Sequence, residues 1–334
     1  MRAAVIAEPG SISVREAPDP TPTPHEVVVA VGACGVCGTD LHIADGEFPP
    51  TPYPIVPGHE FAGTVVEIGS EVATGIAVGD RVAVDPSLFC GHCPACRAGR
   101  GNLCANWGAT GDTVDGAFAE RVAVPAVNAY RLPEHLDLEQ GALVEPLSCA
   151  VHGVRRLGVA MGESMLVVGA GTMGLLLIQL LAGAGAQVTA VDRVAGKLDL
   201  AAKLGAEDTA TSVDELDGEQ FDAVVDVTGV PAAIEEGLDA VRRGGRFLVF
   251  GVASAVARVA VSPFRIYNDE ITVVGSMAVL HSFGAALDLI ADGAVTTDGL
   301  VSHRLPLDAY PQALDIVRQG AGVKVHVRPG EETA

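Results

Sequence analysis

The sequence predicts an α/β protein of two domains, one an irregular β-barrel or sandwich and the other a doubly wound parallel sheet. Its 334 residues are enough to form two separate cores. Up to about residue 150, short β-branched or apolar runs are separated by proline and glycine turn signals. From about residue 151, strand-like and helix-like segments alternate, which is typical of a parallel sheet covered by helices.

In the first part we expect strands at 27–31, 61–68 and 81–84, because these runs are rich in valine and other apolar residues. Turn signals at 18–20 and 78–80 bound them. We expect the functional residues of this part to lie on the connecting loops.

In the second part we expect strands at 165–168, 187–192, 221–227, 246–250 and 271–274. Helical runs are expected at 172–181 and at 197–204, the second of which ends before Gly205 as a cap residue. Ile234, Leu238 and Val241 have the spacing of one helical face. The C-terminal part adds helices at 283–290 and 309–318 and a strand at 324–327.

The composition limits the partners and the compartment. Hydrophobic residues make up 49% of the chain, so a folded core is expected rather than disorder. The formal net charge of −21 repels nucleic acid and anionic membrane surfaces, and we expect neither as a partner. The first ten residues lack the apolar core of a signal peptide, and the apolar run from Leu175 is broken at Gln179, so we expect a cytoplasmic protein. Seven cysteines in a reducing compartment favour metal binding or catalysis over disulfides.

The segment 169–174, Gly-Ala-Gly-Thr-Met-Gly, has the G-x-G-x-x-G pattern of a dinucleotide site. It follows an expected strand, opens an expected helix, and is followed by Asp192 at the end of the next strand. The glycines permit a tight turn, close approach of a pyrophosphate and close packing of helix on strand. Asp192 would accept hydrogen bonds from ribose hydroxyls and repel a 2′-phosphate, which favours NAD over NADP, although Arg193 could pair with that phosphate or stack on the adenine. The expected nucleotide-binding residues are Gly169, Gly171, Thr172, Met173, Gly174, Asp192 and Arg193.

Four cysteines at 90–104 have the spacing C-x2-C-x2-C-x7-C, and they are Cys90, Cys93, Cys96 and Cys104. Four thiolates saturate a tetrahedral zinc and leave no open position, so this site should be structural. His92 lies within the motif and is not needed as a ligand. An iron–sulfur cluster is the alternative for four cysteines, and it is disfavoured in a chain whose other motifs belong to hydride transfer.

A third group of reactive residues lies at 34–42, Cys-Gly-Val-Cys-Gly-Thr-Asp-Leu-His, together with Gly-His-Glu at 58–60. These stretches supply a thiol, a hydroxyl, carboxylates and two imidazoles, the groups needed to hold zinc and to move a proton away from it. Cys34 and Cys37 also form a C-x-x-C that could be a thiol redox pair, but no thioredoxin-like unit surrounds it. We expect Cys34 to be a small buried residue.

These motifs, with Glu-Pro-Leu-Ser at 145–148, resemble the zinc-containing medium-chain dehydrogenase/reductase family in order and over essentially the whole chain. The resemblance implies a GroES-like β-barrel catalytic domain, 1–148 and 280–334, around a Rossmann NAD-binding domain, 149–279. The Glu145-Pro146 pair is most similar to the polyol (sorbitol-type) and threonine dehydrogenase branches.

The resemblance also implies roles for single residues. Cys37 and His59 match zinc ligands. Glu145 matches the third ligand, direct or through water, and Glu60 matches a carboxylate that binds the zinc or lies behind it; the choice between the two glutamates stays open. Thr39 and His42 match the inner and outer ends of a proton relay. Asp40 matches a carboxylate that orients a ligand. Lys324 matches a basic partner of the cofactor pyrophosphate, and the alternative is a solvated lysine at a strand end. Cys149 matches a position beside the nicotinamide or is a packing residue, and Phe48, Trp107 and Phe118 are expected to line the substrate pocket or to belong to the core.

The function implied is zinc-assisted transfer of a hydride between a secondary alcohol or polyol and NAD, with two zinc ions per chain, one catalytic and one structural. Threonine- and aldose-type dehydrogenases of the same family are alternatives. A zinc- and nucleotide-binding protein without turnover is the non-enzyme alternative, and a zinc-free quinone reductase is disfavoured because it would not need the ligands. The family implies a homodimer or homotetramer, with 271–274 as a sheet edge that a second chain could extend.

Overall fold

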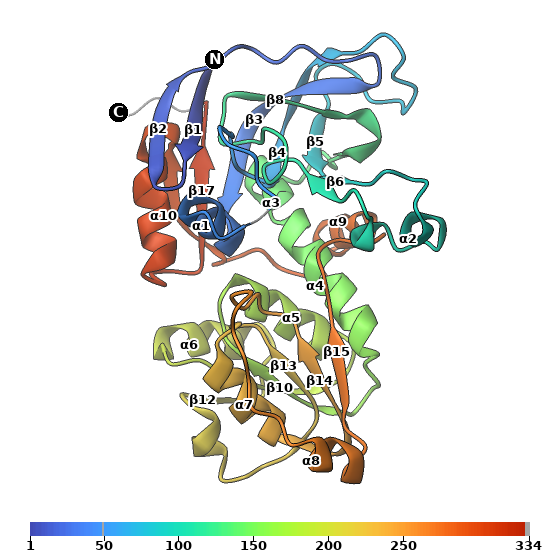
Figure 1. Ribbon diagram of the computed structural model, residues 1–334, viewed down its shortest axis with the longest axis vertical. Coiled ribbons are helices and arrows are strands. Elements are labelled where there is room, and N and C mark those ends of the chain that lie inside the picture. Colours follow the sequence, from blue (N-terminus) through green and yellow to red (C-terminus); the bar gives the residue numbers. More distant parts are fainter. Residues whose placement is uncertain (49, 331–334) are drawn as a thin grey trace. The chain divides into compact units, whose positions relative to one another are not determined.

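The chain forms two compact units in this computed structural model, which describes residues 1–48 and 50–330 (Figure 1). The first unit contains Met1–Ser148, Val279–Gly293 and the chain from Thr297 onward. The second contains Cys149–Ala278 and Ala294–Thr296. The short return segment joins the second unit because the side-chain amide of Gln179 both donates to the Thr296 carbonyl (3.2 Å) and accepts from the Thr296 N–H (2.9 Å).

A seven-stranded sheet with the path β16-β17-β3-β4-β5-β9, and with β8 paired to β3, forms the centre of the first unit. The long strand β3 is bordered by β4 and β8 in its first half and by β4 and β17 at its end, so the sheet curves around one core. Fully buried Phe61 and Phe118 belong to that core. The strands are β3 (Glu26–Val36), β4 (Glu60–Ile68), β5 (Arg81–Val84), β8 (Arg121–Pro125), β9 (Ala129–Arg131), β16 (Val301–Pro306) and β17 (Lys324–Arg328).

Two two-stranded sheets and several helices complete this unit. One is the hairpin of β1 (Arg2–Glu8) with β2 (Ser11–Glu16), and the other pairs β6 (Ser87–Leu88) with β7 (Gly108–Ala109) across the cysteine loop. The helices are α1 (Gly38–Asp45), α2 (Pro94–Arg97), α3 (Leu138–Ala142), α9 (Phe283–Ala291) and α10 (Tyr310–Arg318). Helix α4 (Val144–Leu157) begins in the first unit and continues into the second.

The second unit is a six-stranded parallel sheet in the order β12-β11-β10-β13-β14-β15. The order reverses between β10 and β13, and in such sheets ligands bind beyond the carboxyl ends of the strands at this point. The strands are β10 (Ser164–Val168), β11 (Gln187–Val191), β12 (Asp208–Ala210), β13 (Phe221–Asp226), β14 (Val241–Val249) and β15 (Thr272–Gly275). The helices are α5 (Thr172–Gly183), α6 (Ala195–Lys203), α7 (Pro231–Asp239) and α8 (Pro263–Asn268).

The expected strands and helices are present, with one wrong assignment and several elements that were not expected. Val241 begins strand β14 and pairs with Phe221, so its assignment to a helical face was wrong. Helices α1 and α4 were not expected, and α1 carries residues that we had placed on loops. Gly205 does follow helix α6 as predicted, with a left-handed φ of 119°.

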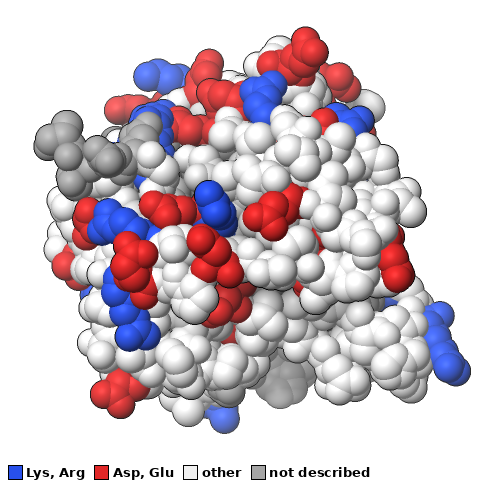
Figure 2. Space-filling model, turned by 90° about the horizontal axis from the view of Figure 1, so that it is seen from above, with Lys and Arg blue, Asp and Glu red and all other residues white. Residues whose placement is uncertain are grey.

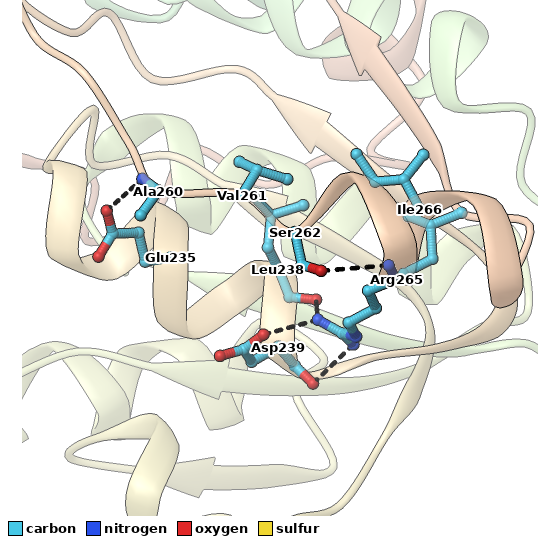
Figure 3. A pocket seen from close by; sticks show the side chains of 9 residues that line it. Glu235, Leu238, Asp239, Ala260, Val261, Ser262, Arg265 and Ile266 are labelled. Atoms are coloured by element: carbon cyan, nitrogen blue, oxygen red, sulfur yellow. Dashed lines mark hydrogen bonds and ion pairs between the residues drawn. The ribbon is translucent and has the colours of Figure 1, made fainter.

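A pocket of the second unit lies between α7 and the segment 260–266 (Figure 3). Its polar groups pair with one another: Glu235 accepts the Ala260 N–H at 2.6 Å, and the Arg265 guanidinium donates to the Asp239 carboxylate at 2.7 Å. Arg265 also donates to the carbonyls of Leu238 and Asp239, at the end of α7, and to that of Val241 at the start of β14. These contacts cap the helix and hold the segment in place, so we do not assign the pocket a ligand.

Acidic and basic side chains are interspersed on the described part of the face shown in Figure 2, with wide areas between them that carry no charge. Within residues 1–48 and 50–330, no helix has both the length and the apolar character needed to cross a bilayer.

Candidate active site

The pairing of β3 with β4 brings the first group of reactive residues together. Gly35 lies opposite Glu60 in this antiparallel pair, so Cys37, just past the end of β3, meets the start of β4. The ligand atoms of Cys37, His59 and Glu60 all lie within 4.8 Å of one another. A Cβ at Gly35 would lie 2.3 Å from Glu60 Oε2, so a larger residue here would displace the Glu60 carboxylate.

The start of helix α1 holds Cys37 in place. Cys37 is the N-cap, and its N–H donates to Asp40 Oδ2 at 2.8 Å, half of a capping box. The Thr39 hydroxyl lies 3.8 Å from Cys37 Sγ, beside the proposed metal position. Asp40 is fully buried, and burial raises its pKa to about 7.

His59 has carboxylates on the side of its Nδ1 atom. Nδ1 lies 3.1 Å from Asp112 Oδ1 and 4.0 Å from Asp40 Oδ1. Burial works against a charged imidazole, but Asp112 and Cys37 together hold the pKa of His59 well above its usual value. Surroundings that stabilise an imidazolium also stabilise a bound cation. Asp112 belongs to no motif and was missed by sequence reasoning.

Glu60 is paired with Lys324. The Lys324 Nζ atom lies 2.5 Å from Glu60 Oε2 and donates to the Val36 carbonyl at 3.2 Å. Glu145 is buried at the start of α4, and its charge contributes to the raised pKa of Lys324. Lys324 is thus a buried partner of a glutamate in the first unit and not a solvated lysine; its pairing with a cofactor phosphate stays a prediction.

The donors of this cluster fit zinc. A thiolate, an imidazole and a carboxylate are the ligands that zinc takes in catalytic sites, where three protein donors leave a fourth position for substrate. The cluster contains Glu60, whereas Glu145 lies nearby, so the geometry favours Glu60 as the carboxylate donor.

His42 lies on the last turn of α1, with 32% of its side chain exposed. Its Nδ1 is 2.9 Å from Glu47 Oε2, a contact that the sequence did not reveal. This arrangement leaves Nε2 available for proton exchange with water.

The burial of Cys34 and Phe118 shows that both side chains belong to the core. Cys34 is fully buried and packs in the core, as expected of a structural cysteine. Phe118 is also fully buried, with its ring 4.5 Å from that of Tyr310, so it belongs to the core and not to a substrate pocket. Phe48 and Trp107 contact each other edge to face, with ring centroids 6.4 Å apart.

The four-cysteine lobe is assembled as predicted. The sulfur atoms of Cys90, Cys93, Cys96 and Cys104 lie within 4.8 Å of one another. The Cys90–Cys96 and Cys93–Cys104 sulfur pairs are 4.0 and 3.9 Å apart. Tetrahedral zinc with bonds of about 2.3 Å places its sulfurs about 3.8 Å apart, so the cage matches this ion. N–H groups of His92 and Cys93 lower the pKa of the Cys90 thiol to about 6, which favours the thiolate that zinc requires.

The glycine motif of the second unit forms a turn between β10 and α5 that fits a pyrophosphate. Gly169 has a left-handed φ of 108°, and a Cβ on Gly174 would lie 1.8 Å from the Gly169 carbonyl oxygen. A Cβ on Gly171, at the N-cap of α5, would meet no protein atom within 4 Å. Thr172 and Met173 begin the helix. The turn is therefore closed by Gly169 and Gly174 and open at Gly171, where a ligand could reach the helix N-terminus.

Asp192 follows β11 and faces this turn. Its Oδ2 accepts the Ala170 N–H at 2.8 Å, and its Oδ1 accepts the Val194 N–H at 2.9 Å. Each oxygen keeps a lone pair for a ribose hydroxyl. Arg193 is exposed and forms no ion pair with any of the described residues.

Comparison with known proteins gives matches along the whole chain. Residues 23–134 match the alcohol dehydrogenase GroES-like domain, and residues 172–292 match zinc-binding dehydrogenase. The chain is 39% identical to D-arabinitol dehydrogenase 1 of Uromyces fabae over 98% of this chain and 97% of that protein. It is 36% identical to D-altritol 5-dehydrogenase of Agrobacterium fabrum (strain C58) over 92% and 93%. A putative zinc-binding dehydrogenase from Sinorhizobium meliloti 1021, solved bound to NADP, superposes with a TM-score of 0.92 at 39% identity, covering 98% of this chain and 99% of that one.

Proposed function

The chain belongs to the zinc-containing medium-chain dehydrogenase/reductase family, and we propose that it oxidises a secondary hydroxyl group of a polyol with NAD as the acceptor. The family and the GroES-like plus Rossmann fold predicted from the motifs are thereby confirmed. The observation that carries the proposal is the cluster of Cys37, His59 and Glu60 within 4.8 Å. Two relatives named above act on polyols, which supports this substrate class.

Three side chains would bind the catalytic zinc, namely Cys37, His59 and Glu60. When bound, zinc supplies a Lewis acid that lowers the pKa of a hydroxyl group. We infer that Lys324 keeps Glu60 ionised and holds its Oε2 atom, which would leave Oε1 as the donor for the metal. Glu145 would then act through water or as a replacement ligand.

Thr39 and His42 would move the proton. The Thr39 hydroxyl lies 3.8 Å from Cys37 Sγ, where it could accept the proton of the substrate hydroxyl while giving up its own proton toward solvent. His42, partly exposed and held at Nδ1 by Glu47, can pass a proton from its other nitrogen to solvent. A dinucleotide held at the glycine turn would supply the acceptor for the hydride, which is the hydrogen and electron pair of the C–H bond beside the hydroxyl.

We propose NAD as the physiological acceptor because Asp192 presents a carboxylate where a 2′-phosphate would lie. The related structure bound to NADP makes this choice worth testing directly. The ratio of kcat/KM for NAD to that for NADP should exceed one and should fall in Asp192→Ser, where exposed Arg193 remains. A preference of the unaltered enzyme for NADP would show that Arg193 outweighs Asp192.

The chain would assemble as a homodimer or homotetramer through the β15 edge. β15 pairs with β14 on one side only among the described residues. Two exposed apolar side chains belong to this segment, Val273 on β15 and Met277 two residues past its end. Light scattering should give a mass above that of one chain, and Val273→Lys should lower it.

The activity is tested by offering NAD and NADP with pentitols, hexitols, simple secondary alcohols, L-threonine and aldoses. Reduction of NAD with a polyol and not with L-threonine or aldoses is the expected result. Reduction of NAD with L-threonine or an aldose, and not with any polyol, would contradict the proposal that polyols are the substrates.

A further inference from the structure

A carboxylate outside every motif lies against the predicted zinc ligand His59. Asp112 Oδ1 is 3.1 Å from His59 Nδ1, and both side chains are 8% exposed. Neither atom makes a hydrogen bond within the described residues, so this close contact is what compensates the buried oxygen. A buried carboxylate needs a partner, and His59 is the one that Asp112 has.

We propose that Asp112 is a positioning residue that fixes the ring of His59, so that Nδ1 carries the proton and Nε2 faces the metal. This inference rests on the proposed function, because it assigns a task toward the catalytic zinc. A carboxylate at one ring nitrogen sets the tautomer and the ring orientation, and it makes the other nitrogen a better ligand.

The local backbone holds Asp112 in a tight turn. The Asp112 and Thr113 N–H groups both donate to the Ala109 carbonyl, at 3.1 and 2.9 Å. The Gly111 N–H donates to the Val114 carbonyl at 2.8 Å, which closes the turn. The carboxylate is therefore presented from a rigid base and not from a free loop.

Two glycines of this loop, Gly111 and Gly116, let it pack directly against the backbone of Gly58, the residue before His59. A Cβ on Gly111 or on Gly116 would lie 2.4 Å from the Gly58 carbonyl oxygen, and the Ala117 N–H donates to that same oxygen at 2.9 Å. Since Gly58 is the neighbour of His59, the turn and the ligand cannot shift independently.

The two carboxylates near His59 have different tasks. Asp40 gives one oxygen to the Cys37 N–H at 2.8 Å, and its other oxygen is 4.0 Å from His59 Nδ1. Asp112 is closer to the imidazole and does not hold Cys37. We therefore assign Asp40 to the positioning of Cys37 and Asp112 to the positioning of His59.

The test compares Asp112→Asn with Asp115→Asn in the full-length zinc enzyme. Asp115 is the matched control, because it lies in the same loop but its Oδ1 accepts the Val56 N–H at 2.8 Å. Zinc affinity of the catalytic site is measured by competition with a chromogenic chelator, and the absorption spectrum is recorded after replacing zinc with Co²⁺. Asp112→Asn should weaken zinc binding about 10- to 100-fold and change the cobalt spectrum, while the cysteine lobe keeps its zinc. Asp115→Asn should leave both readouts unchanged.

Unchanged zinc affinity in Asp112→Asn, or an equal loss in Asp115→Asn, would overturn the assignment. If Asp112→Asn does not fold, Asp112→Ser is used instead, and its zinc affinity and cobalt spectrum are compared with those of Asp115→Asn in the same way. An unaltered protein that holds two zinc ions but oxidises no alcohol would overturn the proposed function alone, since the affinity test does not depend on turnover. An unaltered protein that holds zinc only in the cysteine lobe would overturn both.

Discussion

Lys324 and Glu60 form an ion pair at 2.5 Å in the interior of the first unit, with 4% and 1% of their side chains exposed. Burial alone would raise the pKa of Glu60, but the Lys324 ammonium outweighs burial and holds the pKa below its ordinary value. Burial likewise opposes the charge of Lys324, and the Glu60 carboxylate keeps its pKa above the ordinary value. Each charge therefore depends on the other.

In protein without the catalytic zinc, Lys324→Met should destabilise the first unit by about 3–5 kcal/mol, because it leaves Glu60 buried without its counter-charge. Urea unfolding followed by the fluorescence of Trp107, the single tryptophan and a residue of this unit, measures the change. Arg318→Met is the control, since Arg318 and Asp45 form an exposed pair worth about 0–1 kcal/mol. A loss below about 1 kcal/mol in Lys324→Met would mean that the pair is not what keeps Glu60 charged.

The fully buried His326 should make the first unit sensitive to acid. Burial lowers the pKa of His326 to about 4, whereas the unfolded chain has a histidine pKa near 6.5. Between these values the unfolded chain binds the proton first, so stability should fall as the pH is lowered from about 6.5 to 4, by roughly 3 kcal/mol in total. Above pH 7 the group contributes no pH dependence.

His326→Leu should remove this part of the acid sensitivity, which is measured by urea unfolding at pH 7, 5.5 and 4.5. His25→Leu, at an exposed histidine, should follow the unaltered protein. The interpretation fails if the His326→Leu and unaltered proteins lose the same free energy between pH 7 and 4.5.

Substitutions at two glycines of the motif should affect different properties, NADH binding in one case and stability in the other. Gly171→Ala should weaken NADH binding about tenfold or more with a stability change below about 1 kcal/mol, because its Cβ enters only the space that a pyrophosphate would use. Gly174→Ala should destabilise the second unit by about 1–3 kcal/mol, because its Cβ meets the Gly169 carbonyl. NADH fluorescence titration and thermal unfolding give the two quantities. Gly183→Ala, at the far end of α5, should leave NADH binding unchanged; an equal loss of affinity there would argue against a pyrophosphate at Gly171.

The cysteine lobe should hold one zinc independently of turnover. Cys93→Ser should reduce the metal content from two zinc ions per chain to one and lower the thermal stability, as shown by elemental analysis and unfolding. His92→Ala should keep both ions, because His92 is exposed and its Nδ1 contacts only the Cys90 carbonyl among the described residues. Loss of zinc in His92→Ala would make the histidine a ligand.

The sequence indicated which residues belong to the candidate sites, but it did not indicate most of the contacts that these residues make. Local patterns were sufficient for the strand at 27–31 and for the glycine turn, because both depend on residues that are close in the chain. Helix α1 was missed because its eight residues show no apolar period, and its start depends on the cap at Cys37. Val241 has helical spacing from Leu238, but its pairing with Phe221 decides its structure.

The contacts around Cys37, His59 and Glu60 come from pairings between residues that are distant in the chain. Lys324 is 264 residues from Glu60, and only the alignment of β17 beside β3 brings the two together. Asp112 reaches His59 because three glycines let two loops pack closely, and no spacing rule records that. The grouping of the four cysteine sulfurs was predictable, since all four residues lie on one loop.

The central claim is tested most directly by the rate of NADH formation from NAD with a panel of pentitols and hexitols, in enzyme shown to carry two zinc ions. We expect turnover with at least one polyol and a loss of several orders of magnitude in Cys37→Ser, whose fold and cysteine-lobe zinc should persist. Full turnover in Cys37→Ser would contradict zinc-assisted catalysis at this cluster. No turnover with any polyol would contradict the proposed substrate class.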